Sequence, residues 1–185
     1  MPRRQPPSAR LPRLWLFTDE RVADAALLRA VRRLPRGSGV VFRHYGLESA
    51  ERGGLFATVA ALTRRRGLVL LAAGQAPGRG AAGTHCPAHA IAPRSRRQPG
   101  LISASAHNLR ELAEARRAGA HLVFLSPVFA TRSHPGGRTL GPMRFAMLAH
   151  LVRCPVIALG GMNAGRFRRL KPLGAYGWAA IDALS

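Results

Sequence analysis

The chain has 185 residues, of which 47% are hydrophobic and 20% charged, so it is long enough for one sizeable core. No apolar run approaches the roughly 18 residues of a membrane-spanning helix, which argues against a membrane protein. Lysine and arginine total 29 against 8 acidic residues, and the net charge of +21 would attract polyanions. Almost all of this charge is arginine scattered along the chain, which favours solvated helix faces over nucleic-acid binding.

Residues 1–13 are basic and rich in proline, and the apolar stretch after them is too short for a signal peptide. We expect a disordered basic tail over residues 1–13 and a single domain over residues 14–185. Cys86 and Cys154 are far apart and in no metal-binding spacing, which is typical of a reducing compartment. The expected location is the cytoplasm.

Short apolar segments alternate along the chain with helical ones, a pattern typical of βα units and a parallel sheet. Apolar side chains at helical spacing predict core-facing helices around Val31, Val59 and Phe145. Eight strands are predicted, over residues 14–17, 39–43, 67–72, 83–86, 101–105, 121–126, 155–159 and 176–180.

The sequence carries start and stop signals for one helix, which follows the fifth predicted strand. Asn108 is a plausible N-cap with Glu111 three residues on, and Gly119 ends the helix. Residues 74–83 and 92–100 contain too many glycines and prolines for full helices. The expected fold is therefore α/β, a compact (βα)8 TIM barrel with the helices after the third, fourth and eighth strands reduced. A doubly wound open sheet is the alternative, although no G-x-G-x-x-G follows the first strand.

In a barrel of this kind, chemistry takes place at the carboxyl ends of the strands. Gly160 and Gly161 follow the seventh strand, and the eighth strand ends at Ala180 and Ile181. Glycines allow a ligand to approach the backbone closely, and the loops after the last two strands of a barrel commonly hold phosphate. These four residues are candidate phosphate ligands, with a tight turn that binds nothing as the alternative.

A long polar loop, residues 126–138, follows the sixth strand. Its Thr131, Ser133 and His134 could donate hydrogen bonds to an anionic substrate under a closing lid, and a plain surface loop is the alternative. Arg43 at the end of the second strand and His107 after the fifth complete the candidates. A histidine at a helix start is often structural, so His107 is a candidate because of its place at a strand end.

At these residues the chain resembles the thiamine-phosphate synthase and thiazole tautomerase family. The resemblance covers nearly all of the chain after residue 13. The motifs that carry it are Thr-Asp at 18–19, Gly-x-His at 83–85, Ser-x-His at 105–107, Pro-Val-Phe-x-Thr at 127–131, Leu-Gly at 140–141 and Gly-Gly at 160–161.

The resemblance implies a transferase of thiamine biosynthesis. Such an enzyme joins a hydroxymethylpyrimidine diphosphate to a thiazole phosphate carboxylate and releases diphosphate and carbon dioxide. Its partners would be these small phosphorylated ligands, and a homo-oligomer is left open. A thiazole tautomerase and a non-catalytic phosphate-binding barrel are the alternatives. The implied catalytic residues are Arg43, His107, Ser133 and His134, and the implied phosphate or substrate ligands are Thr131, Gly160, Gly161, Ala180 and Ile181.

The chain departs from the family at the expected magnesium site. No acidic residue lies between Arg52 and Arg110. At the positions where the family has its metal-binding motifs, this chain has Ala-Ala (residues 72–73) and Ala-His-Ala (residues 88–90). Because a hard cation prefers carboxylate oxygens, we predict no metal ligands and a weakened or lost synthase activity. Pro127 stands where the tautomerase branch would have its catalytic histidine.

Overall fold

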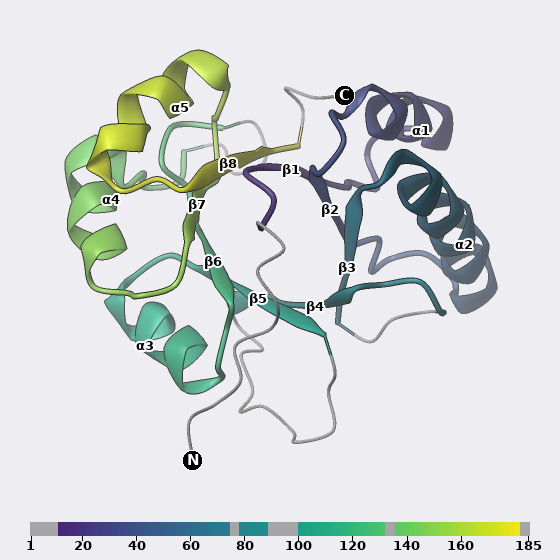
Figure 1. Ribbon diagram of the computed structural model, residues 1–185, viewed down its shortest axis with the longest axis horizontal. Helices are drawn as coiled ribbons and strands as arrows, with labels where there is room; N and C mark the ends of the chain where they lie inside the picture. The colour runs from purple at the N-terminus through teal and green to yellow at the C-terminus, as the bar shows by residue number, and fades with distance from the viewer. Residues whose placement is uncertain (1–10, 75–77, 89–99, 132–135, 182–185) are drawn as a thin grey trace.

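The computed structural model describes residues 11–74, 78–88, 100–131 and 136–181. Eight parallel strands pair in chain order and close into a barrel, because β8 pairs with β1 (Figure 1). The predicted (βα)8 barrel is confirmed. The strands are β1 Leu14–Phe17, β2 Gly39–Phe42, β3 Val69–Ala73, β4 Gly83–Cys86, β5 Leu101–Ala106, β6 Leu122–Leu125, β7 Val156–Ala158 and β8 Gly177–Ala180.

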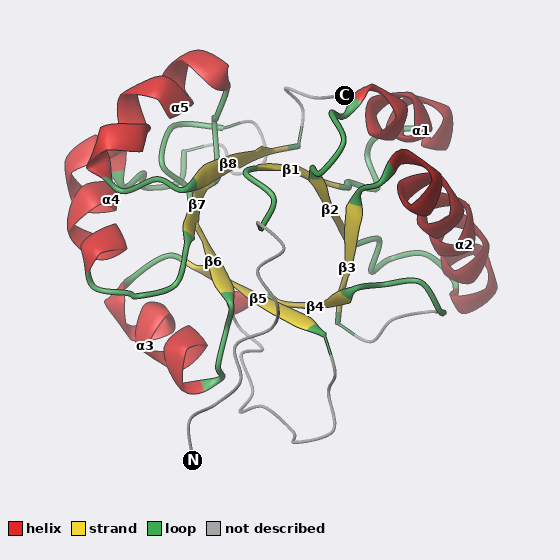
Figure 2. Ribbon diagram, viewed as in Figure 1, coloured by secondary structure: helices red, strands yellow, loops and turns green. Residues whose placement is uncertain are grey.

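The described residues form five α-helices outside the barrel, with α1 and α2 on one side and α3, α4 and α5 on the other (Figure 2). They are α1 Asp24–Arg33, α2 Ser49–Arg66, α3 Leu109–Arg117, α4 Gly141–His150 and α5 Ala164–Leu170, followed by the 3-10 helix η2 Lys171–Leu173. None of the described helices is both long and apolar enough to cross a membrane.

The helical layer is reduced where the glycine-rich and proline-rich segments lie. The described residues between β3 and β4 contain no helix, as the sequence predicts. The segments after β4 and after β8, where reduced helices were also predicted, fall mostly outside the described residues. In Figure 1 no described helix lies against β4, whereas α2 packs against β3 and α3 against β5.

Aromatic and aliphatic side chains fill the barrel interior and alternate along the strands with outward-facing residues. Trp15 and Phe17 of β1 both lie edge-on to Phe124 of β6, with ring centroids 5.4 and 4.8 Å apart. Leu16, between them on β1, instead packs outward with α1 and α2. This alternation is expected for strands that are buried on both faces, and it makes Phe17 the floor of the carboxyl-end cavity described below.

The predicted cap of α3 is confirmed and extends to the preceding strand. Asn108 Oδ1 accepts a hydrogen bond from the Glu111 N–H at 3.0 Å. The Glu111 carboxylate reaches past the cap and accepts from the His107 N–H at 2.7 Å. Two helix-end donors are thus satisfied, and the backbone of His107 is fixed at the carboxyl end of β5.

The boundary of the predicted N-terminal tail needs a correction. Residues 11–13, which the sequence assigned to the disordered tail, are ordered against the amino end of the barrel. Tyr176 Oη donates to the Leu11 carbonyl at 2.7 Å, and the Trp178 N–H donates to the Arg13 carbonyl at 2.8 Å. The apolar Leu11 packs with the barrel interior, so residues 11–13 belong with the barrel. Residues 1–10 lie outside the described residues.

Candidate active site

The carboxyl ends of the strands enclose a cavity of about 420 Å³, which we call the main pocket. A neighbouring cavity of about 320 Å³, the side pocket, lies over the ends of β7 and β8. Both cavities are lined by Thr131, Leu159, Gly160 and Ile181, so they form one continuous region. Polar side chains reach the main pocket from several loops and strands: Arg43, Tyr45, His85, Ser105, His107, Ser126, Thr131 and Arg138.

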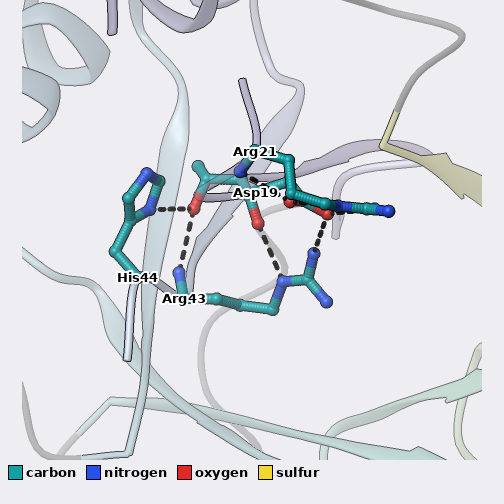
Figure 3. A network of polar contacts seen from close by, with 5 residues as sticks. Asp19, Arg21, Arg43 and His44 are labelled. Atoms are coloured by element: carbon teal, nitrogen blue, oxygen red, sulfur yellow. Dashed lines mark hydrogen bonds and ion pairs between the residues drawn. The ribbon is translucent and has the colours of Figure 1, made fainter. Parts of the chain in front are cut away.

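Arg43 follows β2 directly and is held from the end of β1. Its Nε donates to the Thr18 carbonyl at 2.8 Å, and its Nη2 lies 3.3 Å from Asp19 Oδ2 (Figure 3). The guanidinium also lies over the Phe17 ring, 5.6 Å from the centroid. Burial lowers the pKa of Arg43, but an arginine stays charged at any physiological pH. The structure therefore places a fixed cation at the pocket wall, as the sequence suggested.

Asp19 is shared between two arginines. Its Oδ2 pairs with Arg21 Nη2 at 2.7 Å as well as with Arg43 (Figure 3). The side-chain hydrogen bond from Arg21 is the main cause that holds the pKa of Asp19 at about 2. The carboxylate is consequently ionised and fully engaged, which leaves it poorly suited to bind a metal ion.

His44 lies behind Arg43 and is buried. Its Nδ1 is 2.9 Å from Thr18 Oγ1, the same oxygen that accepts from the Arg43 N–H. Thr18 can therefore donate its single hydroxyl proton to Nδ1, and burial lowers the pKa of His44, which favours the neutral ring that can accept it. Nε2 of His44 has no hydrogen-bond partner among the described residues.

His85, on β4, lies in the barrel interior between two serines of β5. Its Nδ1 is 2.9 Å from Ser103 Oγ, and its Nε2 is 3.1 Å from Ser105 Oγ. Burial lowers its pKa to about 3, so the ring is neutral at physiological pH. A neutral imidazole has one donor and one acceptor, and it can fix the direction of the Ser105 hydroxyl that lines the main pocket.

His107 lies after β5 at the mouth of the main pocket, as the sequence predicted. Its Nδ1 is 2.7 Å from the Ser126 carbonyl oxygen. A carbonyl can only accept, so Nδ1 must carry the proton in this contact. In the neutral ring Nε2 is then an acceptor, and it is the nitrogen that can take a proton from a ligand.

The loop after β7 and the end of β8 bring four predicted phosphate ligands together. Gly160, Gly161, Ala180 and Ile181 all line the side pocket, with Thr131 opposite them. The N–H groups of Gly160 and Gly161 have no acceptor among the described residues. Two N–H groups that lack an acceptor among the described residues and lie beside a cavity are suited to bind the oxygens of a phosphate.

Both glycines are needed for the shape of this loop. Gly160 and Gly161 have φ of 89° and 60°, values that L side chains rarely adopt. A Cβ on Gly160 would lie 2.8 Å from Pro127, and one on Gly161 would lie 2.4 Å from the Ala130 carbonyl oxygen. The loops after β6 and β7 are therefore packed directly against each other.

The remaining predicted residues, Ser133 and His134, lie outside the described residues, so their catalytic role stays a prediction. The structure also adds residues that the sequence did not single out. Arg52 of α2 donates to carbonyl oxygens at the ends of β2 and β3, and Arg138 lines the main pocket. No sequence signal separates these two from the other arginines, although Arg138 follows a Gly-Gly pair in the polar loop.

The residues of the site do not fit a magnesium ion. Ala73 ends β3 at one position where the family resemblance leads us to expect an aspartate, and Ala88 follows β4 where it leads us to expect a glutamine. The second expected aspartate position, residue 90, lies outside the described residues. Within the described part of the chain, no three His, Cys, Asp or Glu side chains are grouped closely enough to hold a metal. No acidic residue lines the main pocket among those described, and Asp19 beside it is bound to two arginines. Without carboxylate oxygens a hard cation lacks its preferred ligands.

A closed parallel barrel that gathers histidine, serine and arginine side chains at the carboxyl ends of its strands is typical of the small-molecule enzymes built on this fold. Within that class, the chain belongs to the thiamine monophosphate synthase family, whose model matches residues 14–184. The family resemblance expected from the motifs is thereby confirmed, and this family is one of transferases.

Relatives of known name agree with this assignment. "Putative thiamine-phosphate synthase 2" of Aquifex aeolicus is 32% identical over 180 residues, which cover 93% of this chain and 97% of that protein. Thiamine-phosphate synthase of Pyrococcus furiosus is 32% identical over 84 residues, which are 45% of this chain and 41% of that protein. The solved structure of thiamine phosphate pyrophosphorylase from Pyrococcus furiosus has a TM-score of 0.74 at 23% identity, covering 94% of this chain and 86% of that one. The structural likeness shows the same barrel fold.

Proposed function

We propose that the protein is a thiamine-phosphate-synthase-type transferase that acts on a pyrimidine diphosphate and a thiazole phosphate. The observation that carries the proposal is the continuous region formed by the main and side pockets, because it offers two different anion-binding walls. Arg43 stands on one wall, and the free N–H groups of Gly160 and Gly161 stand on the other. Two phosphorylated substrates need two such walls.

In the proposed reaction the bond between the pyrimidine methylene carbon and the diphosphate oxygen breaks, and the diphosphate leaves with the electron pair. The thiazole nitrogen then forms a new bond to that carbon. The thiazole carboxylate leaves as carbon dioxide, and the ring carbon keeps the electron pair of the broken bond and takes up a proton from water. Arg43 would stabilise the departing diphosphate, and the Gly160–Gly161 turn with Thr131 would hold the thiazole phosphate. The Phe17 ring at the pocket floor would shield the carbocation from water.

His107 and Ser105 complete the proposed site between the two walls. His107 Nε2 can accept a proton, and Ser105 can orient a polar group of the pyrimidine. Ser133 and His134 of the loop after β6, and Ala180 and Ile181 at the end of β8, remain proposed contacts on the strength of the sequence. The proposed partners are small phosphorylated ligands in the cytoplasm, with no role for nucleic acid or a membrane.

The direct test is to incubate the purified protein with both phosphorylated precursors and to measure thiamine phosphate by chromatography. We expect product, and Thr131→Ala should lower the rate at limiting thiazole phosphate. Thr58→Ala is the matched control, because Thr58 is exposed on α2 and its hydroxyl donates within its own helix. Absence of product under all conditions would refute the proposed activity.

The tautomerase alternative has no support from the site. Pro127, not a histidine, lines the main pocket at the position where that branch's catalytic residue is expected. A non-catalytic phosphate-binding barrel is the outcome if the protein binds thiazole phosphate, seen as a rise in melting temperature, without forming product.

A further inference from the structure

The β2–β4 side of the main pocket presents Arg43 where the family resemblance leads us to expect a metal ion. Arg43 and Arg138 line the cavity, and no described acidic residue does. Ala88 also lines it on this side. An anion that enters the pocket therefore meets guanidinium groups and apolar surface.

Arg52 adds a third positive charge from behind the strand ends. Its Nε donates to the His44 carbonyl at 2.8 Å, and its Nη2 lies 3.2 Å from the Ala73 carbonyl oxygen and 3.4 Å from that of Arg43. The guanidinium is thus bound across the ends of β2 and β3 and lies over the Phe42 ring, 5.7 Å from its centroid. Since arginine cannot lose its proton, this charge is permanent.

Arg43 still has donors for a ligand. Its contacts with Thr18 and Asp19 use Nε and Nη2, and Nη1 has no partner among the described residues. Arg138 is exposed and lines the same cavity from the loop after β6. Two guanidinium groups that reach one cavity from different loops can bind separate oxygens of one diphosphate.

We propose that the main pocket binds the diphosphate group through Arg43 and Arg138, with Arg52 as a fixed supporting charge, and without a divalent metal ion. The diphosphate is that of the pyrimidine substrate, so the site rests on the proposed function. A guanidinium is a diffuse cation that binds through directed hydrogen bonds, whereas a divalent ion concentrates charge on a few oxygens. Binding should therefore occur without metal and weaken with added salt.

The test is calorimetric titration of the whole protein with sodium diphosphate, in EDTA and in magnesium chloride, at low and at high sodium chloride concentration. We expect binding in EDTA that magnesium does not strengthen and that high salt weakens. Arg43→Ala and Arg138→Ala should each weaken binding in EDTA, Arg43→Ala by about tenfold, as expected for loss of a hydrogen bond to a charged group. Binding that appears only with magnesium would overturn the proposal.

Arg116→Ala is the matched control for net charge. Arg116 is exposed near the carboxyl end of α3, which lies at the opposite end of the barrel from the pocket. If Arg116→Ala weakened binding as much as Arg43→Ala, the effect would come from the general charge of the protein, and the site would be wrong. Thermal melting checks that Arg43→Ala is folded. Arg138 is exposed in a loop, so Arg138→Ala tests the site even if Arg43→Ala does not fold.

The two proposals can fail separately. Diphosphate binding in EDTA without formation of thiamine phosphate would refute the transferase activity and leave the metal-free site intact. Product formation together with strictly magnesium-dependent diphosphate binding would refute the metal-free site and leave the activity intact.

Discussion

His85 Nε2 of β4 lies 3.1 Å from Ser105 Oγ of β5. His85 contacts two serines, and of these two only Ser105 lines the main pocket. Ser103, on the other ring nitrogen, is completely buried. The imidazole therefore links the closed interior of the barrel to the wall of the cavity. Because burial keeps this ring neutral, the link has the same hydrogen-bonding pattern across the physiological pH range.

Because His85 is kept neutral in the folded protein, the free energy of unfolding falls in acid. Its pKa is about 3 in the folded protein and about 6.5 when unfolded. Between these values the unfolded chain binds a proton that the folded chain does not, so the free energy of unfolding must fall as pH drops below about 6.5. The expected slope reaches about 1.4 kcal/mol per pH unit for this residue. The lowered pKa of His44 acts in the same direction.

Urea unfolding at about pH 7, 6 and 5 measures this slope directly. His85→Gln can still bond to both serines but does not titrate, so its slope should be shallower than that of the unchanged protein. Asp19 does not contribute to this slope. Its pKa is about 2 in the folded protein, so the stabilisation that its carboxylate provides is lost only below about pH 4. Equal slopes for the two proteins would show that His85 titrates normally.

Asp19→Asn should strengthen diphosphate binding. The substitution removes the carboxylate that partly neutralises Arg43, so we expect an affinity increase of several-fold in EDTA. The lost ion pairs should lower the free energy of unfolding by about 1 kcal/mol or less, since Arg21 is largely exposed. Glu114→Gln makes the same change in net charge on α3 and should leave the affinity unchanged. Weaker binding by Asp19→Asn would mean that Asp19 positions Arg43 for its ligand.

Gly160→Ala should destabilise the protein by about 2–4 kcal/mol, because the positive φ and the overlap with Pro127 both oppose a Cβ. Gly141→Ala separates the two causes. Gly141 has φ of 65° but nothing within 4 Å of its added Cβ, so only the backbone cost of about 1 kcal/mol applies. Chemical denaturation compares the two variants, and equal losses would contradict the direct packing of the two loops.

Ala88→Asp should restore part of a metal requirement. A carboxylate on the wall of the main pocket would repel diphosphate, so the affinity for diphosphate in EDTA should fall by about tenfold. Magnesium should restore part of the lost affinity. Ala57→Asp, at an exposed position of α2, is the control for added negative charge. The calorimetric titration used for the arginine variants applies here, and unchanged affinity of Ala88→Asp in EDTA would place the diphosphate elsewhere.

Most of the strands were predictable because they are short apolar runs bounded by glycine, proline or polar residues, and β4, with the sequence Gly-Thr-His-Cys, is an exception. The main shift is at β3, which begins at Val69 and not at residue 67, because Gly67 ends α2 in the left-handed conformation. The helix after Asn108 was predictable for a similar reason, since its cap is local in sequence. Closure of the barrel followed from the number of strands.

The polar contacts of the site depend on tertiary register, which a single sequence does not encode locally. His85 meets Ser103 because β4 and β5 pair these residues directly. Arg52 reaches the strand ends because α2 packs over β2 and β3, and its position on the helix resembles that of any solvated arginine. The sequence could thus predict the positions of Arg43, His107 and the Gly160–Gly161 turn at the carboxyl ends of strands, because Arg43 and His107 directly follow a strand and the turn comes one residue after β7.

The contact between Leu11 and Tyr176 joins residues separated by 165 positions in the chain. Bringing two points this far apart together costs about 4.5 kcal/mol of chain entropy beyond a constant, more than any single βα unit requires. Strand pairs that are close in sequence should therefore form first, and the seam between β1 and β8 should form late in folding. During synthesis β1 leaves the ribosome first of the eight strands, but it cannot complete its pairing until β8 has been made.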